Sequence, residues 1–361
     1  MEFEARGGGV VIRGRDTGIR NQFKFPKGEN DMPKALNLAA LAAMLTMAAM
    51  SMVALPVANA ADRLVVSNGH LTGWDTLVTS FGVRKGFFQA QGLDVQIVEM
   101  DTGAPMLQAV VSGSIDVAVG ASLPGFIGAA MKGAPLKMIS ASFTGVSDFS
   151  WYVRATSPIH SFKDVTENTT LAYSSNGSSS QIALLSMMKQ AGVTGKPVPT
   201  GNLSATLTQV MTGQVDVGYE GNGGLGVAEF QRGDVRFIGN GADLESFRDQ
   251  TVRGVVVTQA TLAGRRDQLV RFLMAYRQTI EWMYRDPEAL QWFADNAQTS
   301  LAEARRVVDM IYPASALRLG PVHHLDQTVA QAVAFKRIPQ TPTAAQLDDM
   351  FDQTLLPADS E

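Results

Sequence analysis

The sequence contains no cysteine and only four histidines, at positions 70, 160, 323 and 324. Without cysteine there are no disulfides, thiol nucleophiles, cysteine-ligated zinc sites, iron–sulfur clusters or lipidated cysteine anchors. No HExxH motif is present, and the adjacent pair at 323 and 324 is badly spaced for two ligands on one helix face. We therefore expect neither a metal site nor a cofactor.

An excess of basic charge is also missing. Lys and Arg number 30 against 34 Asp and Glu, so the formal net charge is −4 and nothing points to a nucleic-acid partner. The sequence has no GxSxG motif and no Ser–His–Asp order with supporting spacing, so we predict that the protein is not an enzyme. The length of 361 residues, with 45% hydrophobic and 18% charged residues, predicts a globular chain of two lobes.

Residues 32–60 have the three parts of a secretory signal peptide. Lys34 supplies the positive charge, an uncharged apolar stretch follows it, Pro56 breaks that stretch, and residues 58–60 (ANA) form a small-residue cleavage pattern. An uncleaved membrane anchor is the alternative, because the apolar stretch is near the length that spans a bilayer. Pro56 and the cleavage pattern favour export, which predicts a periplasmic protein. We interpret residues 1–31 as a non-native or misannotated extension.

The rest of the chain begins with alternating strand-like and helix-like segments, which predict mostly parallel sheets with flanking helices. The expected strands are 63–67, 93–98, 115–119 and 137–141, and the expected helices are 75–90 and 104–112. The C-terminal part predicts a helical tail. Its expected helices are 267–285, 301–312, 325–336 and 343–355.

An internal repeat supports two lobes of similar topology. Residues 107–120 (LQAVVSGSIDVAVG) correspond to residues 207–220 (LTQVMTGQVDVGYE) at an offset of 100. Each copy predicts a helix that ends at a glycine, followed by a turn and a buried strand. Because Asp116 and Asp216 match each other, we expect structural turn residues rather than a catalytic pair.

The loops at the carboxyl ends of the strands are the expected ligand site, because open parallel sheets bind ligands there. The segment 174–180 (SSNGSSS) leads into a helix expected at 181–190. Its hydroxyls, amide groups and helix N-terminus predict an anion site, with Asn176, Ser178, Ser179 and Ser180 as contacts. Ordinary helix capping is the alternative.

Other loops supply the remaining expected contacts, which are His70, Trp74, Ser122, Thr144, Glu220 and Asn222. We expect His70 and Ser122 to donate hydrogen bonds to an anionic group. Trp74 is expected to pack on the ligand, with a core tryptophan as the alternative. Glu220 is expected to bind a cationic or N–H group, with a solvated loop carboxylate as the alternative.

Several short motifs resemble a known family. The motifs are Gly86-Phe87-Phe88, Gly92-Leu93-Asp94-Val95, Asp101-Thr102-Gly103 and Gly113-Ser114-Ile115-Asp116-Val117-Ala118. The sequence resembles the periplasmic substrate-binding proteins of ABC importers for nitrate, sulfonates and taurine, over about residues 62–340. That group shares the NMT1/THI5-like domain with thiamine-pyrimidine synthases.

The resemblance implies an α/β, two-lobed periplasmic binding protein of type II. The first lobe would hold residues 61–150 plus 251–361, and the second lobe would hold 151–250. The family's anion contacts fall on the loop of Ser122 and on Ser178 to Ser180. Its partners would be a small-molecule ligand and an ABC permease with a cytoplasmic ATPase, and the protein would be a monomer.

The expected function is therefore capture of a small polar, anionic or zwitterionic organic solute, similar to a sulfonate or taurine, for import. One loop departs from the pattern, because residues 219–222 read YEGN where taurine binders resemble Trp-Ala-Pro. Glu220 there keeps open a thiamine-pyrimidine-type or other N-heterocycle ligand. A periplasmic sensor or enzyme on the same scaffold is the remaining alternative, although the cysteine cluster of the pyrimidine synthases is absent.

Overall fold

The computed structural model describes residues 61–69, 71–100 and 103–356. The predicted signal peptide, the extension before it and His70 lie outside these residues. Within the described part of the chain, no helix combines the length and the apolar character needed to cross a membrane. The described residues belong to a single unit of the chain.

A five-stranded mixed sheet organises the first lobe, in the order β2-β1-β3-β10-β4. Strands β1 (Asp62–Asn68), β2 (Leu93–Glu99) and β3 (Val117–Ser122) run parallel to each other. Strand β10 (Thr251–Thr258) returns from late in the chain and pairs antiparallel with both β3 and β4 (Leu136–Thr144). Its burial is nearly complete because it lies inside the sheet.

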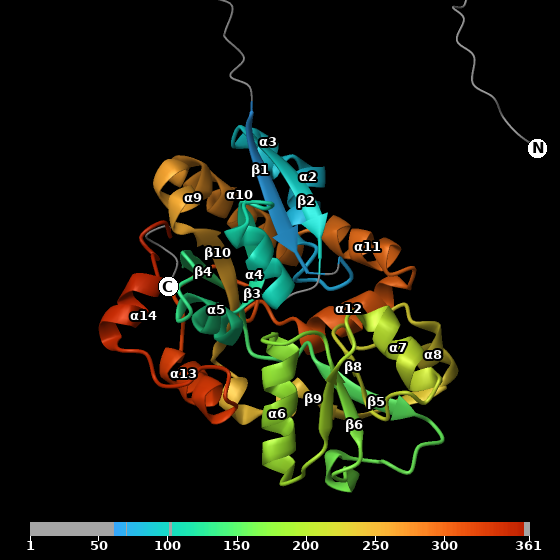
Figure 1. The fold of residues 1–361 in the computed structure, drawn as a ribbon. Helices are drawn as coiled ribbons and strands as arrows, with labels where there is room; N and C mark the ends of the chain where they lie inside the picture. The colour runs from blue at the N-terminus through green and yellow to red at the C-terminus, as the bar shows by residue number, and fades with distance from the viewer. Residues whose placement is uncertain (1–60, 70, 101–102, 357–361) are drawn as a thin grey trace, which may run out of the picture. The chain divides into compact units, whose positions relative to one another are not determined.

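Helices flank this sheet (Figure 1). Those between its strands are α2 (Val78–Lys85), α3 (Phe87–Ala90), α4 (Ala104–Val111) and α5 (Leu123–Ala130). The single helix expected over 75–90 is two helices, because Gly86 between them has a φ of +86° and ends the first one. Such a left-handed conformation is the usual way in which a helix ends at glycine.

The second lobe is built between residues 150 and 247, where strand β5 (Ser150–Arg154) pairs antiparallel with β8 (Gly218–Glu220) and β9 (Val235–Asn240). Strands β6 (Thr170–Tyr173) and β7 (Lys196–Pro199) form a parallel pair. The helices and short 3₁₀ turns here are η1 (Phe162–Asp164), α6 (Ser179–Ala191), α7 (Leu203–Met211), α8 (Ala228–Arg232), η2 (Gly241–Asp243) and η3 (Glu245–Phe247).

The chain after β10 is helical and packs back on the first lobe. Its helices are α9 (Gln259–Gly264), α10 (Arg266–Arg285), α11 (Pro287–Asn296), α12 (Leu301–Ile311), α13 (Leu325–Ala334) and α14 (Ala344–Met350). Helix α10 contacts α2 and α3, and the rings of Phe88 and Phe272 stack with centroids 5.3 Å apart. The predicted helical tail is confirmed.

The internal repeat has one structural role in both lobes. The backbone N–H of Val65 donates to Asp116 Oδ2 at 2.8 Å, and the N–H of Thr170 donates to Asp216 Oδ2 at 2.8 Å. Asp116 thus connects the turn before β3 to the middle of β1, and Asp216 connects the turn before β8 to the first residue of β6. The expectation of structural turn residues is confirmed.

Candidate ligand-binding site

A cavity of about 80 Å³ lies between the two lobes. It has room for roughly five to eight water-sized groups, so a ligand enclosed there is small. The cavity is lined by Gly69, Thr72, Gly73, Asp75, Thr76, Asp148, Phe149, Ser174, Ser179, Leu203, Tyr219, Gly221 and Arg253. These residues come from the loops that follow strands β1, β6 and β8, from β8 itself, from the first residues of α6 and α7, and from the two segments where the chain passes between the lobes. The position agrees with the loops that the sequence predicts as the ligand site.

Arg253 lies between the two aspartates that line this cavity, Asp75 and Asp148. Its Nη2 lies 2.7 Å from Asp148 Oδ2, and its Nη1 donates to Asp75 Oδ2 at 3.2 Å. The guanidinium carbon also lies 4.1 Å from the centroid of the Phe143 ring, within the range of a cation–π contact. Arg253 stands on β10 with Phe143 as its register partner in β4, so the sheet fixes where the guanidinium lies.

The three charged groups are buried together, and the single positive charge of Arg253 does not neutralise the two carboxylates. The side chains of Arg253, Asp75 and Asp148 are 10%, 11% and 2% exposed. Burial, opposed by the charge of Arg253 and reinforced by the charge of Asp75, raises the pKa of Asp148 to about 6. When both carboxylates are ionised, the cluster carries one net negative charge.

The serine-rich loop faces the same cavity through only two of its side chains, those of Ser174 and Ser179. Ser178 Oγ accepts from the N–H of Gln181 at 3.2 Å and caps helix α6. Ser180 Oγ accepts from the N–H of Ser174 at 3.0 Å. These hydroxyls therefore have partners within the loop, while Ser179 Oγ makes only a long contact of 3.4 Å to the carbonyl of Val252.

Asn176 lies on the exposed side of this loop, where its Oδ1 accepts from the hydroxyl of Tyr173 at 2.8 Å. The alternative of ordinary capping thus describes part of the segment. Anion binding by Asn176, Ser178, Ser179 and Ser180 stays a prediction.

Glu220 and Asn222 lie beside the cavity rather than in its wall. Glu220 is 5% exposed, and its Oε1 accepts from the N–H groups of Gly221 and Asn222 at 3.1 and 3.0 Å. Burial raises the pKa of Glu220 to about 7. The neighbouring Gly221 lines the cavity, so Glu220 holds the shape of this loop.

Hydrogen bonds join the lobes beside the cavity. Asn222 Nδ2 donates to the carbonyl of Thr72 at 2.8 Å, and the hydroxyl of Tyr312 donates to the carbonyl of Gly221 at 2.8 Å. Thr72 belongs to the first lobe and Gly221 to the second. The described arrangement is therefore one in which the lobes are closed on each other.

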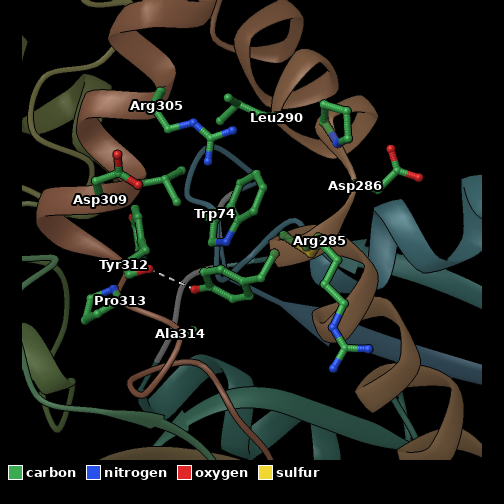
Figure 2. A pocket seen from close by; sticks show the side chains of 13 residues that line it. Trp74, Arg285, Asp286, Leu290, Arg305, Asp309, Tyr312, Pro313 and Ala314 are labelled. Carbon is green, nitrogen blue, oxygen red and sulfur yellow. Dashed lines mark hydrogen bonds between the residues drawn. The ribbon is translucent and has the colours of Figure 1, made fainter.

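Trp74 lies in the aromatic core next to the cavity. It is 1% exposed, and its ring centroid lies 5.3 Å from that of Phe293 and 5.8 Å from that of Tyr284. It lines a separate cavity of about 360 Å³ formed with α11 and α12. Figure 2 shows Trp74 at the centre of that second cavity, with Arg305 of α12 beside it. The structure therefore gives Trp74 the core position that the sequence analysis named as the alternative to a ligand contact.

Two further predicted residues, Ser122 and Thr144, do not line the small cavity. Ser122 is 1% exposed, its hydroxyl has no hydrogen-bond partner, and it is the register partner of Arg253 on the β3 side. Thr144 lines a third cavity, of about 470 Å³, together with residues of η2 and η3. The structure thus brings Ser179 to the cavity wall, places Ser122, Glu220 and Asn222 next to it, and leaves Thr144 apart.

Sequence reasoning missed the charged cluster. Arg253 stands in the otherwise apolar strand sequence TVRGVVVT, and an arginine inside such a strand is an available signal, because buried charges need partners. Asp148 and Arg253 each lie within three residues of an expected lobe boundary, at 150/151 and 250/251. Nothing local to either residue indicates that they meet.

No group of three or more His, Cys, Asp or Glu side chains in the described ranges is arranged to hold a metal ion.

Known proteins share this fold at low sequence identity. The periplasmic aliphatic sulphonate binding protein SsuA from Escherichia coli matches with a TM-score of 0.61 and 19% identity, over 79% of this chain and 91% of that one. The alkanesulfonate-binding protein SsuA from Xanthomonas axonopodis pv. citri, bound to MOPS, matches with a TM-score of 0.65 and 17% identity, over 80% and 98%. The desulfurization enzyme DSZB matches with a TM-score of 0.57 and 15% identity, over 81% and 97%.

These likenesses establish a periplasmic binding protein fold, as the sequence predicts. No curated protein sequence matches the chain. A family model described as NMT1/THI5 like matches residues 80–290, which is more than half of the sequence and spans most of both lobes. The chain therefore belongs to the NMT1/THI5-like family.

Proposed function

We propose that this protein is a periplasmic solute-binding protein that captures a small polar, anionic or zwitterionic organic solute between its two lobes. The observation that carries the proposal is the small cavity that both lobes line and that the hydrogen bonds of Asn222 and Tyr312 close. A hinged pair of lobes that encloses a small molecule is suited to capture and release. The names of two relatives of the same fold, which are sulfonate-binding proteins, support a solute of that class.

The proposal includes delivery of the solute to an ABC permease with a cytoplasmic ATPase. Export through the predicted signal peptide at 32–60 would place the protein on the side of the membrane from which such importers collect solutes. We propose that one monomer binds one solute molecule. Ser179 in the cavity wall, with Ser178 and Ser180 at the start of α6, would bind the anionic group, because the first N–H groups of a helix lack intrahelical partners.

A thermal-shift screen of the purified protein tests this function. The panel holds alkyl and aryl sulfonates, taurine, nitrate, carboxylates, amino acids and pyrimidines. A ligand at about a hundred times its Kd adds roughly 2.7 kcal/mol, which is several degrees for a chain of this size. Stabilisation by one chemical class is the expected result. Absence of any shift, from folded protein freed of carried-over ligand, would contradict the proposal.

Two variants test the proposed contacts. Ser179→Ala removes a hydroxyl from the cavity wall, and Glu220→Ala removes the carboxylate that holds the Gly221 loop. We expect both to lower affinity for the ligand found in the screen. If neither changes it, the proposed contacts are wrong.

An enzyme or a sensor on the same scaffold is the second candidate, and the likeness to the desulfurization enzyme is the observation that favours it. Recovery of the ligand distinguishes the two functions. A binding protein returns its ligand unchanged after prolonged incubation, whereas an enzyme returns a product that mass spectrometry detects.

A further inference from the structure

Asp148, which lines the interlobe cavity, has one buried carboxylate oxygen without a hydrogen-bond partner. Its side chain is 2% exposed, and Asp148 is among the residues that line the cavity. Oδ2 lies 2.7 Å from Arg253 Nη2, whereas Oδ1 is buried and has no hydrogen-bond partner. Leaving a buried acceptor without a donor costs about 1–3 kcal/mol, and more when the group is charged. A ligand that supplies the missing donor would recover this free energy.

The charges around the cavity favour a cation in that position. Asp75 and Asp148 line the cavity with Arg253, which is the one cationic side chain among its described lining residues. Both terminal nitrogens of Arg253 lie close to carboxylate oxygens, although its Nη2 and Nε make no hydrogen bond, and its guanidinium lies over the Phe143 ring. An anion placed there would meet one net negative charge in a poorly solvated site. A cation would balance the cluster.

We propose that the Asp148 carboxylate, held in place by Arg253, is a subsite for a protonated nitrogen of the ligand. This inference rests on the proposed function and narrows its substrate class to small zwitterions that carry an ammonium group. The cavity of about 80 Å³, with room for roughly five to eight water-sized groups, limits the ligand to a small molecule. Nitrate and alkanesulfonates without an amine leave Asp148 Oδ1 unpartnered and are poor ligands.

Matched pairs of solutes test the subsite directly. The probes are 2-aminoethanesulfonate against 2-hydroxyethanesulfonate and ethanesulfonate, and 3-aminopropanoate against propanoate. Isothermal titration calorimetry of the wild-type protein measures each affinity. We expect each amine to bind at least tenfold more tightly than its amine-free partners. Equal affinity within both pairs overturns the inference and leaves the proposed function standing, whereas no binding by any probe or by the wider panel overturns both.

The Asp148→Asn variant tests whether Asp148 is the residue that causes tighter binding of the amines. The amide keeps the size of the side chain and removes its charge, so affinity for the amine should fall at least tenfold while the amine-free partners bind as before. Asp309→Asn is the matched control, because Asp309 is exposed and lines the separate cavity beside Trp74. An unchanged preference in Asp148→Asn overturns the inference. Should that variant fail to fold, the wild-type pairs alone still decide it.

Discussion

Gly125 in helix α5 and Gly177 in the loop before α6 place the backbones of the two lobes in direct contact. A Cβ atom built on Gly125 would lie 2.5 Å from the carbonyl oxygen of Gly177, closer than real Cβ atoms approach a backbone oxygen. Glycine inside a helix costs about 1 kcal/mol relative to alanine. The closed arrangement therefore uses a locally unfavourable residue to let the lobes meet.

Gly125→Ala should hold the lobes apart while it leaves the first lobe folded. The added methyl group collides with the second lobe, so closure around a ligand becomes costly and affinity should fall at least tenfold. Small-angle X-ray scattering should show a larger radius of gyration than for the wild type. Gly264→Ala at the end of α9 is the control, because a Cβ there meets nothing within 4 Å. Unchanged affinity in Gly125→Ala would show that this contact does not limit closure.

Arg253→Met should destabilise the protein strongly. The substitution leaves the buried carboxylates of Asp75 and Asp148 without their cation, and breaking such a buried cluster costs about 3–5 kcal/mol. Urea denaturation measures the loss. The exposed pair of Arg306 and Glu303 supplies the control, since Arg306→Met should change the free energy of unfolding by less than about 1 kcal/mol. Adding Asp148→Asn to Arg253→Met should recover part of the loss, and a double variant no more stable than the single one would contradict this account.

The stability of the ligand-free protein should fall as the pH rises from about 5 to 8. Burial raises the pKa of Glu220 from its ordinary value of 4.5 to about 7 and that of Asp148 from 3.8 to about 6. The folded protein therefore binds protons that the unfolded chain has released. The resulting stabilisation is complete below the ordinary pKa values and is lost as the pH passes the raised ones.

Glu220→Gln isolates one part of this pH dependence. For Glu220 the effect is on the order of 3 kcal/mol, because each pKa unit corresponds to about 1.36 kcal/mol. Urea denaturation at pH 5 and pH 8 should show a smaller difference for this variant than for the wild type. Glu245→Gln, at a side chain that is 88% exposed, should keep the wild-type difference. Stability that rises with pH in the wild type would refute the prediction.

The sequence predicts the secondary structure well where the apolar pattern is strong. The helix expected over 267–285 is α10 (Arg266–Arg285), and the strand expected over 93–98 is β2 (Leu93–Glu99). Local periodicity carries this information because each element buries one regular face. The meeting of Arg253 with Asp75 is different, since β10 returns to the first sheet 178 residues later and only the tertiary fold brings the two together.

Trp74 shows the same limit on predicting the site. A loop tryptophan after a strand is compatible with a ligand contact or with a core position, and the choice depends on α10 and α11. Those helices supply Tyr284 and Phe293 to its rings from more than 200 residues away in the chain. Residue type and loop position indicate the edge of the sheet that faces the interlobe cavity, but not which side chains reach the cavity.

Asp116 and Asp216 should contribute to stability separately and not to ligand binding. Asp116→Ala removes the hydrogen bond from the N–H of Val65 and the ion pair with Arg265, whose Nη1 lies 2.7 Å from Asp116 Oδ1. Asp216→Ala removes the bonds from the N–H and hydroxyl of Thr170, both at 2.8 Å. Each loss should cost about 1–2 kcal/mol, because hydrogen bonds to charged groups are among the stronger ones.

Urea denaturation of both single variants and the double variant checks this assignment. Since the two aspartates lie in different lobes and share no partner, the double variant should lose the sum of the single losses within about 0.5 kcal/mol. Ligand affinity should stay within twofold of the wild type, because neither residue lines the interlobe cavity. Asp309→Ala, which removes an exposed carboxylate, is the control for the loss of charge alone. A fall in affinity without a fall in stability would mean that the repeated aspartate serves the ligand site, and that the similarity between the lobes is functional rather than structural.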